Sequence, residues 1–257
     1  MATTNGSLIS VEDVTVRFGG VIAVNRASMA VPAGEIRGLI GPNGAGKTTL
    51  FDTITGMRLP SGGTVHYDGL DITSRSAVWR SRNGIRRTFQ RQQPFGWLSV
   101  EDNVLVALDY RGGGGGLIAD LVAFPTRKRI ESERRERARK AVDRCGLSDV
   151  RDVAAGKLSI GKIRLLELAR AIVDEPRLLL LDEPTSGLEE YEAHRFADVV
   201  REFRANSDAA VLLVEHDVPF VMNLCDRVTV LNLGEVIAEG TTHEVANNPD
   251  VRAAYLG

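Results

Sequence analysis

Apolar and polar residues alternate along the first part of the chain, which predicts strands that each bury one face. Residues 11–18 alternate in this way, and a second strand is expected over residues 27–31. Residues 64–67, followed by Asp68 and Gly69, predict a hairpin. We therefore expect half-buried antiparallel strands near the amino terminus.

The second half of the chain alternates between helical periodicity and short apolar runs. Helices are predicted over residues 163–174, 190–205 and 218–223, and strands over residues 178–181, 210–214 and 228–231. Residues 35–40 form another apolar run, followed by a glycine-rich turn and a helix over residues 48–54. Such alternation favours a mostly parallel sheet covered by helices. The sequence from Thr241 to Glu244 supplies a capping box for a short terminal helix.

The middle section is predicted to be mostly helical, with a flexible loop at the glycine run of residues 112–116. Arginine, lysine and glutamate interleave over residues 127–145, which is typical of an exposed helix with many ion pairs. Residues 75–91 contain arginine at positions 75, 80, 82, 86, 87 and 91 and no acidic residue. Two interpretations of this stretch stay open: a solvated helix face, or a docking surface for an acidic partner or lipid headgroups.

The composition is that of an ordinary globular protein. Of 257 residues, 43% are hydrophobic and 26% charged, and 32 basic residues nearly cancel 34 acidic ones. This excludes disorder, collagen and a disulfide scaffold, and it leaves no overall positive field for nucleic acid. Cys145 and Cys225 are expected to be reduced and buried. No run approaches the ~18 apolar residues that cross a bilayer, so membrane association is expected to need a partner.

A phosphate-binding motif follows the strand over residues 35–40. Its residues are Gly41, Pro42, Asn43, Gly44, Ala45, Gly46, Lys47 and Thr48, with Thr49 next in the chain. The pattern is G-x-x-x-x-G-K-[ST], between a predicted strand and a predicted helix as the motif requires. The glycines let backbone N–H groups turn towards a phosphate, and Lys47 can reach the β and γ oxygens. The Thr48 hydroxyl can take a coordination position on Mg²⁺.

Polar residues follow two of the predicted strands. Asp182 and Glu183 end the strand over residues 178–181, where Asp182 is placed to hold Mg²⁺ through water and Glu183 to orient or deprotonate an attacking water. His216 follows residues 210–214 and is expected at the same sheet edge, within reach of a γ-phosphate. Gln90 is a weaker candidate, since it is a single polar residue beside the basic stretch.

Together these residues resemble the nucleotide-binding subunit of ATP-binding cassette transporters over nearly the whole chain. Residues 158–162, Leu-Ser-Ile-Gly-Lys, stand where the family has its L-S-G-G-Q signature, and residues 186–189 are similar to its D-loop. The resemblance makes Gln90 the Q-loop glutamine and a Mg²⁺ ligand, His216 the switch histidine, and Phe18 the aromatic residue that stacks on adenine. It implies that ATP and Mg²⁺ are the cofactors.

The resemblance also implies the fold: an α/β P-loop NTPase core with an N-terminal antiparallel β subdomain and an inserted α-helical subdomain. The β subdomain is expected over residues 8–34 and 63–75, the core over 35–62, 76–90 and 165–240, the helical subdomain over 91–164, and a C-terminal helix over 241–257. The chain is thus expected to be a single cassette.

More narrowly, three parts of the chain are similar to the ATPase subunits of branched-chain amino acid importers: residues 87–90, the helical insertion around the glycine run, and residues 240–257, which end in Ala-Tyr-Leu-Gly. The implied function is to hydrolyse ATP and power uptake of branched-chain amino acids or related polar solutes. The implied location is cytoplasmic, peripheral on the inner face of the cell membrane through integral permease subunits. A solute-binding protein is an indirect partner, and no nucleic acid is expected. Arg86, Arg87 and Arg91 are expected to meet acidic residues of the permease coupling helix.

In this family, ATP is enclosed between two subunits that meet head to tail. Ser159 and Gly161 are therefore expected to close over the γ-phosphate held by a second ATPase subunit, at the start of a helix. Ile160 and Lys162 replace a glycine and the glutamine of the signature, and Glu189 stands where aspartate is common. These departures favour a heterodimer with a more regular subunit over a homodimer.

Two other functions stay open at this stage. A cassette ATPase acting on ribosomes or DNA has against it the single cassette and the balanced charge. A non-catalytic switch, in which ATP only drives dimerisation, is favoured by the altered signature and opposed by Glu183 and His216.

Overall fold

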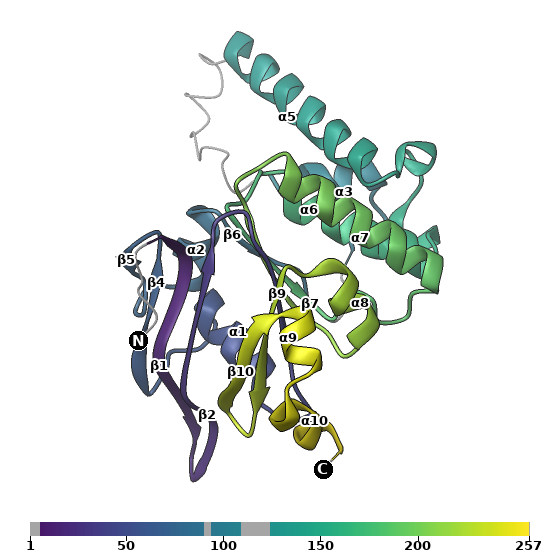
Figure 1. The fold of residues 1–257 in the computed structure, drawn as a ribbon. Helices are drawn as coiled ribbons and strands as arrows, with labels where there is room; N and C mark the ends of the chain where they lie inside the picture. The colour runs from purple at the N-terminus through teal and green to yellow at the C-terminus, as the bar shows by residue number, and fades with distance from the viewer. Residues whose placement is uncertain (1–5, 90–93, 109–123, 257) are drawn as a thin grey trace. The chain divides into compact units, whose positions relative to one another are not determined.

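The computed structural model describes residues 6–89, 94–108 and 124–256 (Figure 1). Gln90, Arg91 and the glycine run of residues 112–116 lie outside these ranges. The chain forms two compact units. The first comprises residues 1–90, 176–186 and 200–257, and the second comprises residues 91–175 and 187–199.

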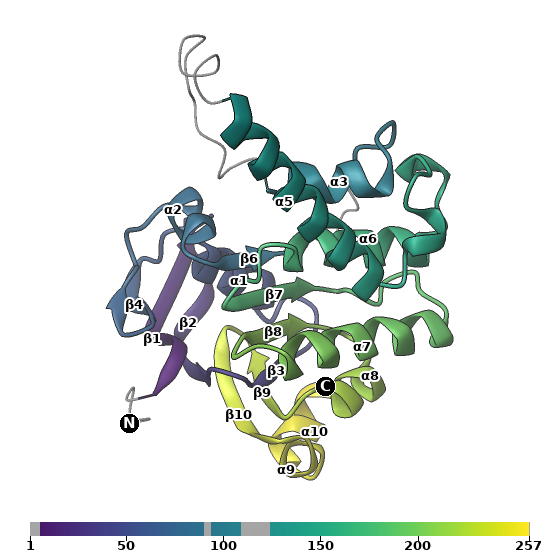
Figure 2. The same ribbon diagram turned by 90° about the horizontal axis from the view of Figure 1, so that it is seen from above.

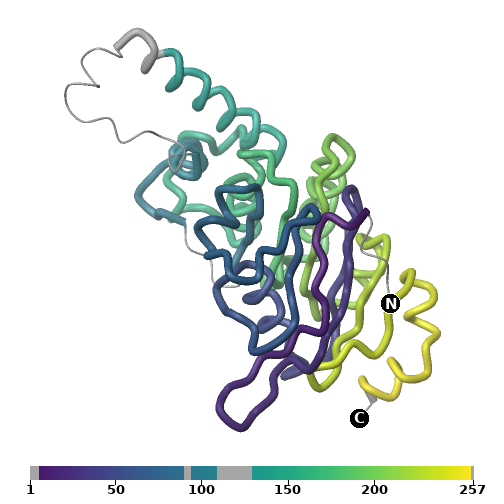
Figure 3. The backbone as a smooth tube through the Cα atoms, turned by 90° about the vertical axis from the view of Figure 1, so that its left-hand side faces the viewer, coloured from purple at the N-terminus to yellow at the C-terminus, as the bar shows by residue number. Residues whose placement is uncertain are grey.

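An antiparallel sheet of the first unit has the strand order β2-β1-β4-β5. Its strands are β1 (Ser7–Phe18), β2 (Val21–Pro32), β4 (Gly62–Tyr67) and β5 (Leu70–Asp71). Figure 3 follows the long β1–β2 hairpin in purple. Asp68 and Gly69 join β4 to β5 with φ angles of 52° and 75°, the left-handed geometry of a tight hairpin turn. The predicted antiparallel strands and the hairpin are confirmed.

The second sheet of this unit is mostly parallel and has the order β10-β9-β3-β8-β7-β6 (Figure 2). Its strands are β3 (Ile36–Ile40), β6 (Ile85–Arg87), β7 (Leu178–Asp182), β8 (Ala210–Val214), β9 (Arg227–Asn232) and the antiparallel edge strand β10 (Glu235–Thr241). The strands β3, β7 and β8 are buried at every position, since both faces of the sheet are covered. Parallel pairing brings the ends of β7 and β8 together, with Asp182 opposite Val214.

Helix α1 (Lys47–Thr55) packs in the core that the two sheets share. Leu50, Phe51 and Ile54 of this helix belong to one buried cluster with residues of both sheets, such as Val65 and Leu180. The remaining helices that lie wholly within this unit are α2 (Ala77–Arg82), α8 (Val218–Leu224), α9 (Thr242–Ala246) and α10 (Pro249–Leu256). The predicted capping box is present, because Thr241 and Glu244 exchange both of its hydrogen bonds.

The second unit is helical. It contains α3 (Val100–Val106), α5 (Phe124–Arg144), α6 (Ile160–Ile172), the first part of α7 (Glu190–Ala205) and two 3₁₀ turns, η2 (Ser148–Val150) and η3 (Ala155–Lys157). Glu101 of α3 is buried, and Arg139 donates to its Oε2 over 3.0 Å. Arg129 and Lys140 pair with glutamates four residues away, so the predicted ion-paired helix is confirmed.

Both cysteines, Cys145 and Cys225, are free and buried, as expected. Burial raises the pKa of the Cys225 thiol well above its usual value. Over the ranges that the structure describes, none of the helices combines the length and apolar character that spanning a membrane requires.

Candidate functional site

The loop between β3 and α1 is shaped by glycines in backbone conformations that other residues rarely adopt. Gly41 and Gly46 have φ angles of 152° and 101°. A Cβ atom on Gly41 would lie 2.0 Å from the carbonyl oxygen of Leu231, and one on Gly46 would lie 2.3 Å from that of Ala23. Neither position can carry a side chain, because neighbouring backbone leaves no room. The loop is therefore built for close approach of main-chain atoms.

Lys47, the first residue of α1, lies with its ammonium group inside this loop. Its Nζ donates hydrogen bonds to the carbonyl oxygens of Gly41, at 2.7 Å, and Pro42, at 3.0 Å. The residue is only 6% exposed, and burial lowers the pKa of the ammonium group, while the negative charge of Glu183 acts in the opposite direction. A phosphate that enters the loop can take over these hydrogen bonds.

A hollow of about 210 Å³ opens beside the loop. Its walls are formed by Ala23, Asn43, Gly44, Ala45, Gly46, Lys47, Thr48, Thr49, Glu183 and His216. The structure thus brings most of the predicted phosphate-loop residues together with Glu183 and His216.

Glu183 and His216 form a pair at the ends of β7 and β8. The Nε2 atom of His216 lies 2.9 Å from Oε1 of Glu183. Glu183 has a φ angle of 46°, which is unusual for a residue with a side chain, and its N–H donates to the Val214 carbonyl oxygen over 2.9 Å. Glu215, which follows β8, bonds the segment that follows β7, because its Oε1 accepts a hydrogen bond from the backbone N–H of Thr185 at 2.7 Å. The pair is therefore held by the ends of adjacent strands.

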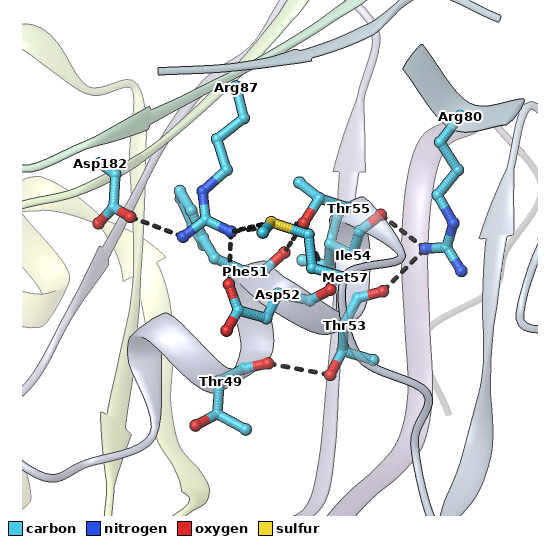
Figure 4. Close-up of polar contacts among 10 residues, drawn as sticks. All are labelled: Thr49, Phe51, Asp52, Thr53, Ile54, Thr55, Met57, Arg80, Arg87 and Asp182. Atoms are coloured by element: carbon cyan, nitrogen blue, oxygen red, sulfur yellow. Dashed lines mark hydrogen bonds and ion pairs between the residues drawn. The ribbon is translucent and has the colours of Figure 1, made fainter. Parts of the chain in front are cut away.

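Asp182 ends β7 and is buried, and its carboxylate is paired with an arginine (Figure 4). Its Oδ2 accepts a hydrogen bond of 2.7 Å from Arg87 of β6. The same guanidinium donates to Oδ1 of Asp52 in α1 over 2.6 Å. Sequence reasoning missed Asp52 and this role of Arg87, since nothing in the local pattern connects positions so far apart.

The arginine stretch is not a solvated face throughout. Arg80 is fully buried and donates to backbone carbonyl oxygens, among them Thr53 at 2.8 Å and Ile54 at 2.6 Å near the end of α1 (Figure 4). Burial lowers the pKa of Arg80 to about 10. The side chain of Arg87 is also buried, with 7% exposed. For Arg80 and Arg87 the interpretation as a solvated face is therefore wrong, because each side chain is buried and bonds acceptors inside the unit. Docking of a partner at this stretch stays a prediction.

Phe18 lies at the end of β1, where it is 44% exposed. The guanidinium of Arg58 lies over its ring, 4.2 Å from the centroid. An exposed aromatic face of this kind can stack on a planar base.

The signature residues lie in the second unit, at the start of α6. Ser159 is the N-cap, and its hydroxyl accepts from the backbone N–H of Lys162 at 3.3 Å. Lys162 Nζ pairs with Asp149 over 2.7 Å, and Ile160 is exposed. A Cβ atom on Gly161 would lie 2.0 Å from a carboxylate oxygen of Glu192, so a side chain at this position would displace the flexible end of Glu192.

A glycine-rich loop between a parallel strand and a helix, with carboxylates at the end of another parallel strand of the same sheet, defines a P-loop nucleotide hydrolase. The ABC transporter family model matches residues 24–186, and the chain belongs to this family. It is a cassette ATPase. A second family model, described as branched-chain amino acid ATP-binding cassette transporter, matches residues 235–257.

Similar proteins include the high-affinity branched-chain amino acid transport ATP-binding protein LivG of Salmonella typhimurium, 40% identical over 97% of this chain and 98% of that protein. BraF of Pseudomonas aeruginosa, which carries the same description, is 37% identical over the same shares of the two chains. A crystal structure of a nucleotide-free ATP-binding cassette from an ABC transporter is 31% identical, with a TM-score of 0.84 over 98% of this chain and 99% of that one. The P-loop cassette fold expected from the sequence is confirmed.

Proposed function

We propose that this chain is the Mg²⁺-dependent ATPase subunit of an importer for branched-chain amino acids or related polar solutes. The observation that carries the proposal is the Glu183–His216 pair on the wall of the hollow that also holds Lys47. The names of LivG and BraF and the family match at residues 235–257 support the solute class.

The phosphate loop and Lys47 would bind the β- and γ-phosphates of ATP. Backbone N–H groups and an ammonium group supply charge-assisted hydrogen bonds, which are about twice as strong as neutral ones. Phe18 would stack on the adenine ring. These contacts would put the γ-phosphate on the side of the hollow that Glu183 and His216 line.

The donor set fits Mg²⁺. Thr48 and Asp182 provide a hydroxyl and a carboxylate, the hard oxygen ligands that this ion prefers. No group of three or more His, Cys, Asp or Glu that could hold a metal occurs among the residues that the structure describes. This agrees with an ion held largely by phosphate oxygens and water. When bound, Mg²⁺ would neutralise charge on the phosphates, and Gln90, outside the described ranges, remains a proposed ligand.

Glu183 is the proposed general base. Its carboxylate would accept a proton from the water that attacks the γ-phosphorus, while the bond from that phosphorus to the bridging oxygen breaks and ADP leaves. The Nε2 atom of His216 bonds Glu183, so the imidazole can hold the carboxylate in place, or it can donate instead to a phosphate oxygen as negative charge develops there. This carboxylate–imidazole pair favours a catalytic role over a purely ATP-dependent switch.

A hollow of about 170 Å³ is the proposed docking place for the permease. Its walls include Met57, Ala77, Ile85, Arg86 and Phe89, and both Met57 and Phe89 are exposed. An apolar depression beside a guanidinium fits an amphipathic helix with an acidic residue. Of the arginines assigned to this contact from the sequence, Arg86 and Arg87 line the hollow, and Arg91 lies outside the described ranges. Arg87 is also paired with Asp52 and Asp182 inside the unit. Attached in this way, the chain would be peripheral on the inner face of the membrane.

The second ATPase subunit is proposed to be a different chain. Ile160 puts a branched, exposed side chain beside the Ser159 cap, and Lys162 is bound to Asp149, so the signature lacks the small and neutral groups expected there. A solute-binding protein would act through the permease. A partner nucleic acid is not proposed.

The test is uptake and phosphate release by the chain assembled with permease subunits in vesicles. With wild type, ATP should drive uptake of radiolabelled leucine, and Glu183→Gln should abolish both signals. Equal phosphate release by wild type and Glu183→Gln would favour the switch instead. Full activity of the chain as a homodimer would contradict the heterodimer, and transport of an unrelated solute but not leucine would contradict the solute class.

A further inference from the structure

Arg87 joins the carboxylate proposed to hold Mg²⁺ to the helix that begins at the phosphate loop. We propose that Arg87 is a positioning residue that competes with Mg²⁺ for Asp182, and that Asp52 limits this competition by holding the same guanidinium. The inference rests on the proposed function, because it concerns the affinity for Mg²⁺ together with ATP.

The geometry leaves the guanidinium little freedom. Different nitrogens of Arg87 bond Asp52, at 2.6 Å, and Asp182, at 2.7 Å (Figure 4). The rings of Phe51 and Phe89 lie 5.6 Å and 5.4 Å from its central carbon. Arg87 is thus one cation shared between two carboxylates, held in place from several sides.

Because Asp182 is buried, the positive charge of Arg87 acts strongly on a metal ion that approaches the Asp182 carboxylate. The Asp182 side chain is 6% exposed, so water screens its interaction with Arg87 poorly. A guanidinium bonded to Oδ2 offsets part of the negative charge that would attract Mg²⁺ and occupies one of the lone-pair directions. Asp182 must therefore give up or share a strong hydrogen bond when it turns towards the ion.

Asp52 is expected to weaken the competition of Arg87 with Mg²⁺ for Asp182. It is more exposed than Asp182 and bonds the nitrogen of Arg87 that Asp182 does not use. Removing the charge of Asp52 would leave Arg87 with one carboxylate partner and strengthen the ion pair between Arg87 and Asp182. Removing the charge of Arg87 would release Asp182. The two substitutions are thus expected to move the Mg²⁺ requirement in opposite directions, although each breaks the same ion-pair network.

The experiment measures binding of a fluorescent trinitrophenyl ATP analogue to the purified full chain during a Mg²⁺ titration that starts in EDTA. The readout is the Mg²⁺ concentration that gives half of the metal-dependent gain in affinity. Arg87→Gln should lower this concentration, and Asp52→Asn should raise it, each by at least about threefold. Arg82→Gln removes an exposed guanidinium from α2, and it should leave the value unchanged.

Shifts in the same direction for Arg87→Gln and Asp52→Asn, or no shift in either, would overturn the proposal, because loss of a merely structural network predicts one of those results. If Arg87→Gln does not fold, Arg87→Lys takes its place. A lysine is a point charge without the two-pronged guanidinium, so it should also lower the Mg²⁺ requirement, by less; a rise would contradict the proposal. If wild type binds the analogue neither in EDTA nor with Mg²⁺, the proposed function itself fails. If wild type binds the analogue but the variants require the same Mg²⁺ concentration as wild type, only this inference is rejected.

Discussion

The imidazole of His216 and the carboxylate of Glu183 are hydrogen-bond partners, with Nε2 and Oε1 2.9 Å apart. The two residues are separated by 33 positions in the chain and meet because β7 and β8 are adjacent parallel strands. Taken alone, a glutamate or a histidine at the end of a strand is also compatible with a purely structural role. Together, on the wall of the hollow beside Lys47, they are the base and the orienting group of the proposed mechanism.

Glu183→Gln should lower steady-state phosphate release at least about 100-fold, because an amide cannot accept the proton of the attacking water. ATP affinity should be kept, since Lys47 and the loop amides are untouched. Phosphate release and calorimetric ATP binding check the two parts of this expectation. Glu175→Gln, at an exposed position, is the matched control and should leave both unchanged.

His216→Ala should also slow phosphate release, and its effect should depend on Glu183. If His216 works through the carboxylate, the double variant Glu183→Gln/His216→Ala should be no slower than Glu183→Gln alone. The four phosphate-release rates form a double-mutant cycle that measures this coupling. Additive losses would show that the two side chains act independently and that their hydrogen bond has no part in hydrolysis.

Lys47→Ala should weaken ATP binding at least tenfold, because it removes charge-assisted contacts worth roughly 1.5–3 kcal/mol each. The fold should survive, since the hydrogen bonds of Lys47 go to two carbonyl oxygens of its own loop. Calorimetry gives the affinity and circular dichroism the fold. Unchanged affinity in a folded variant would contradict the assignment of the phosphate loop.

Arg80→Ala should lower the free energy of unfolding by at least about 3 kcal/mol. The substitution removes the hydrogen bonds that one guanidinium donates to several buried carbonyl oxygens, and each hydrogen bond from a charged group contributes about 1.5–3 kcal/mol. Chemical denaturation measures the change. Arg82→Ala removes an exposed arginine from the same helix and should be nearly neutral, so similar losses in the two variants would contradict the structural role of Arg80.

Much of the core could be predicted from local patterns. The strand over residues 210–214 and the helix over residues 190–205 have the expected bounds, because a continuous apolar run and a long amphipathic period are local signals. The strands β6 and β10 were missed. The first is three residues long and rich in arginine, and the second lies at a sheet edge, where polar residues interrupt the alternation.

The site was predictable where a motif fixes the chemistry and unpredictable where partners come together only in the fold. The phosphate loop, Glu183 and His216 were found from motif and strand-end position. Arg80 and Arg87 were assigned to the surface because six arginines without an acid suggest solvation. Their acceptors lie elsewhere in the chain: backbone carbonyls at the end of α1 for Arg80, and Asp52 and Asp182 for Arg87.

Arg80 clamps the carboxyl end of α1 by bonding the Thr53 and Ile54 carbonyls, whereas the amino end continues directly into the glycine-rich loop. The carboxyl end of this helix is therefore fixed by a buried side chain of α2, and in the proposed function its amino end would hold the nucleotide. A displacement of α2 that moves Arg80 would therefore reach the phosphate loop through α1.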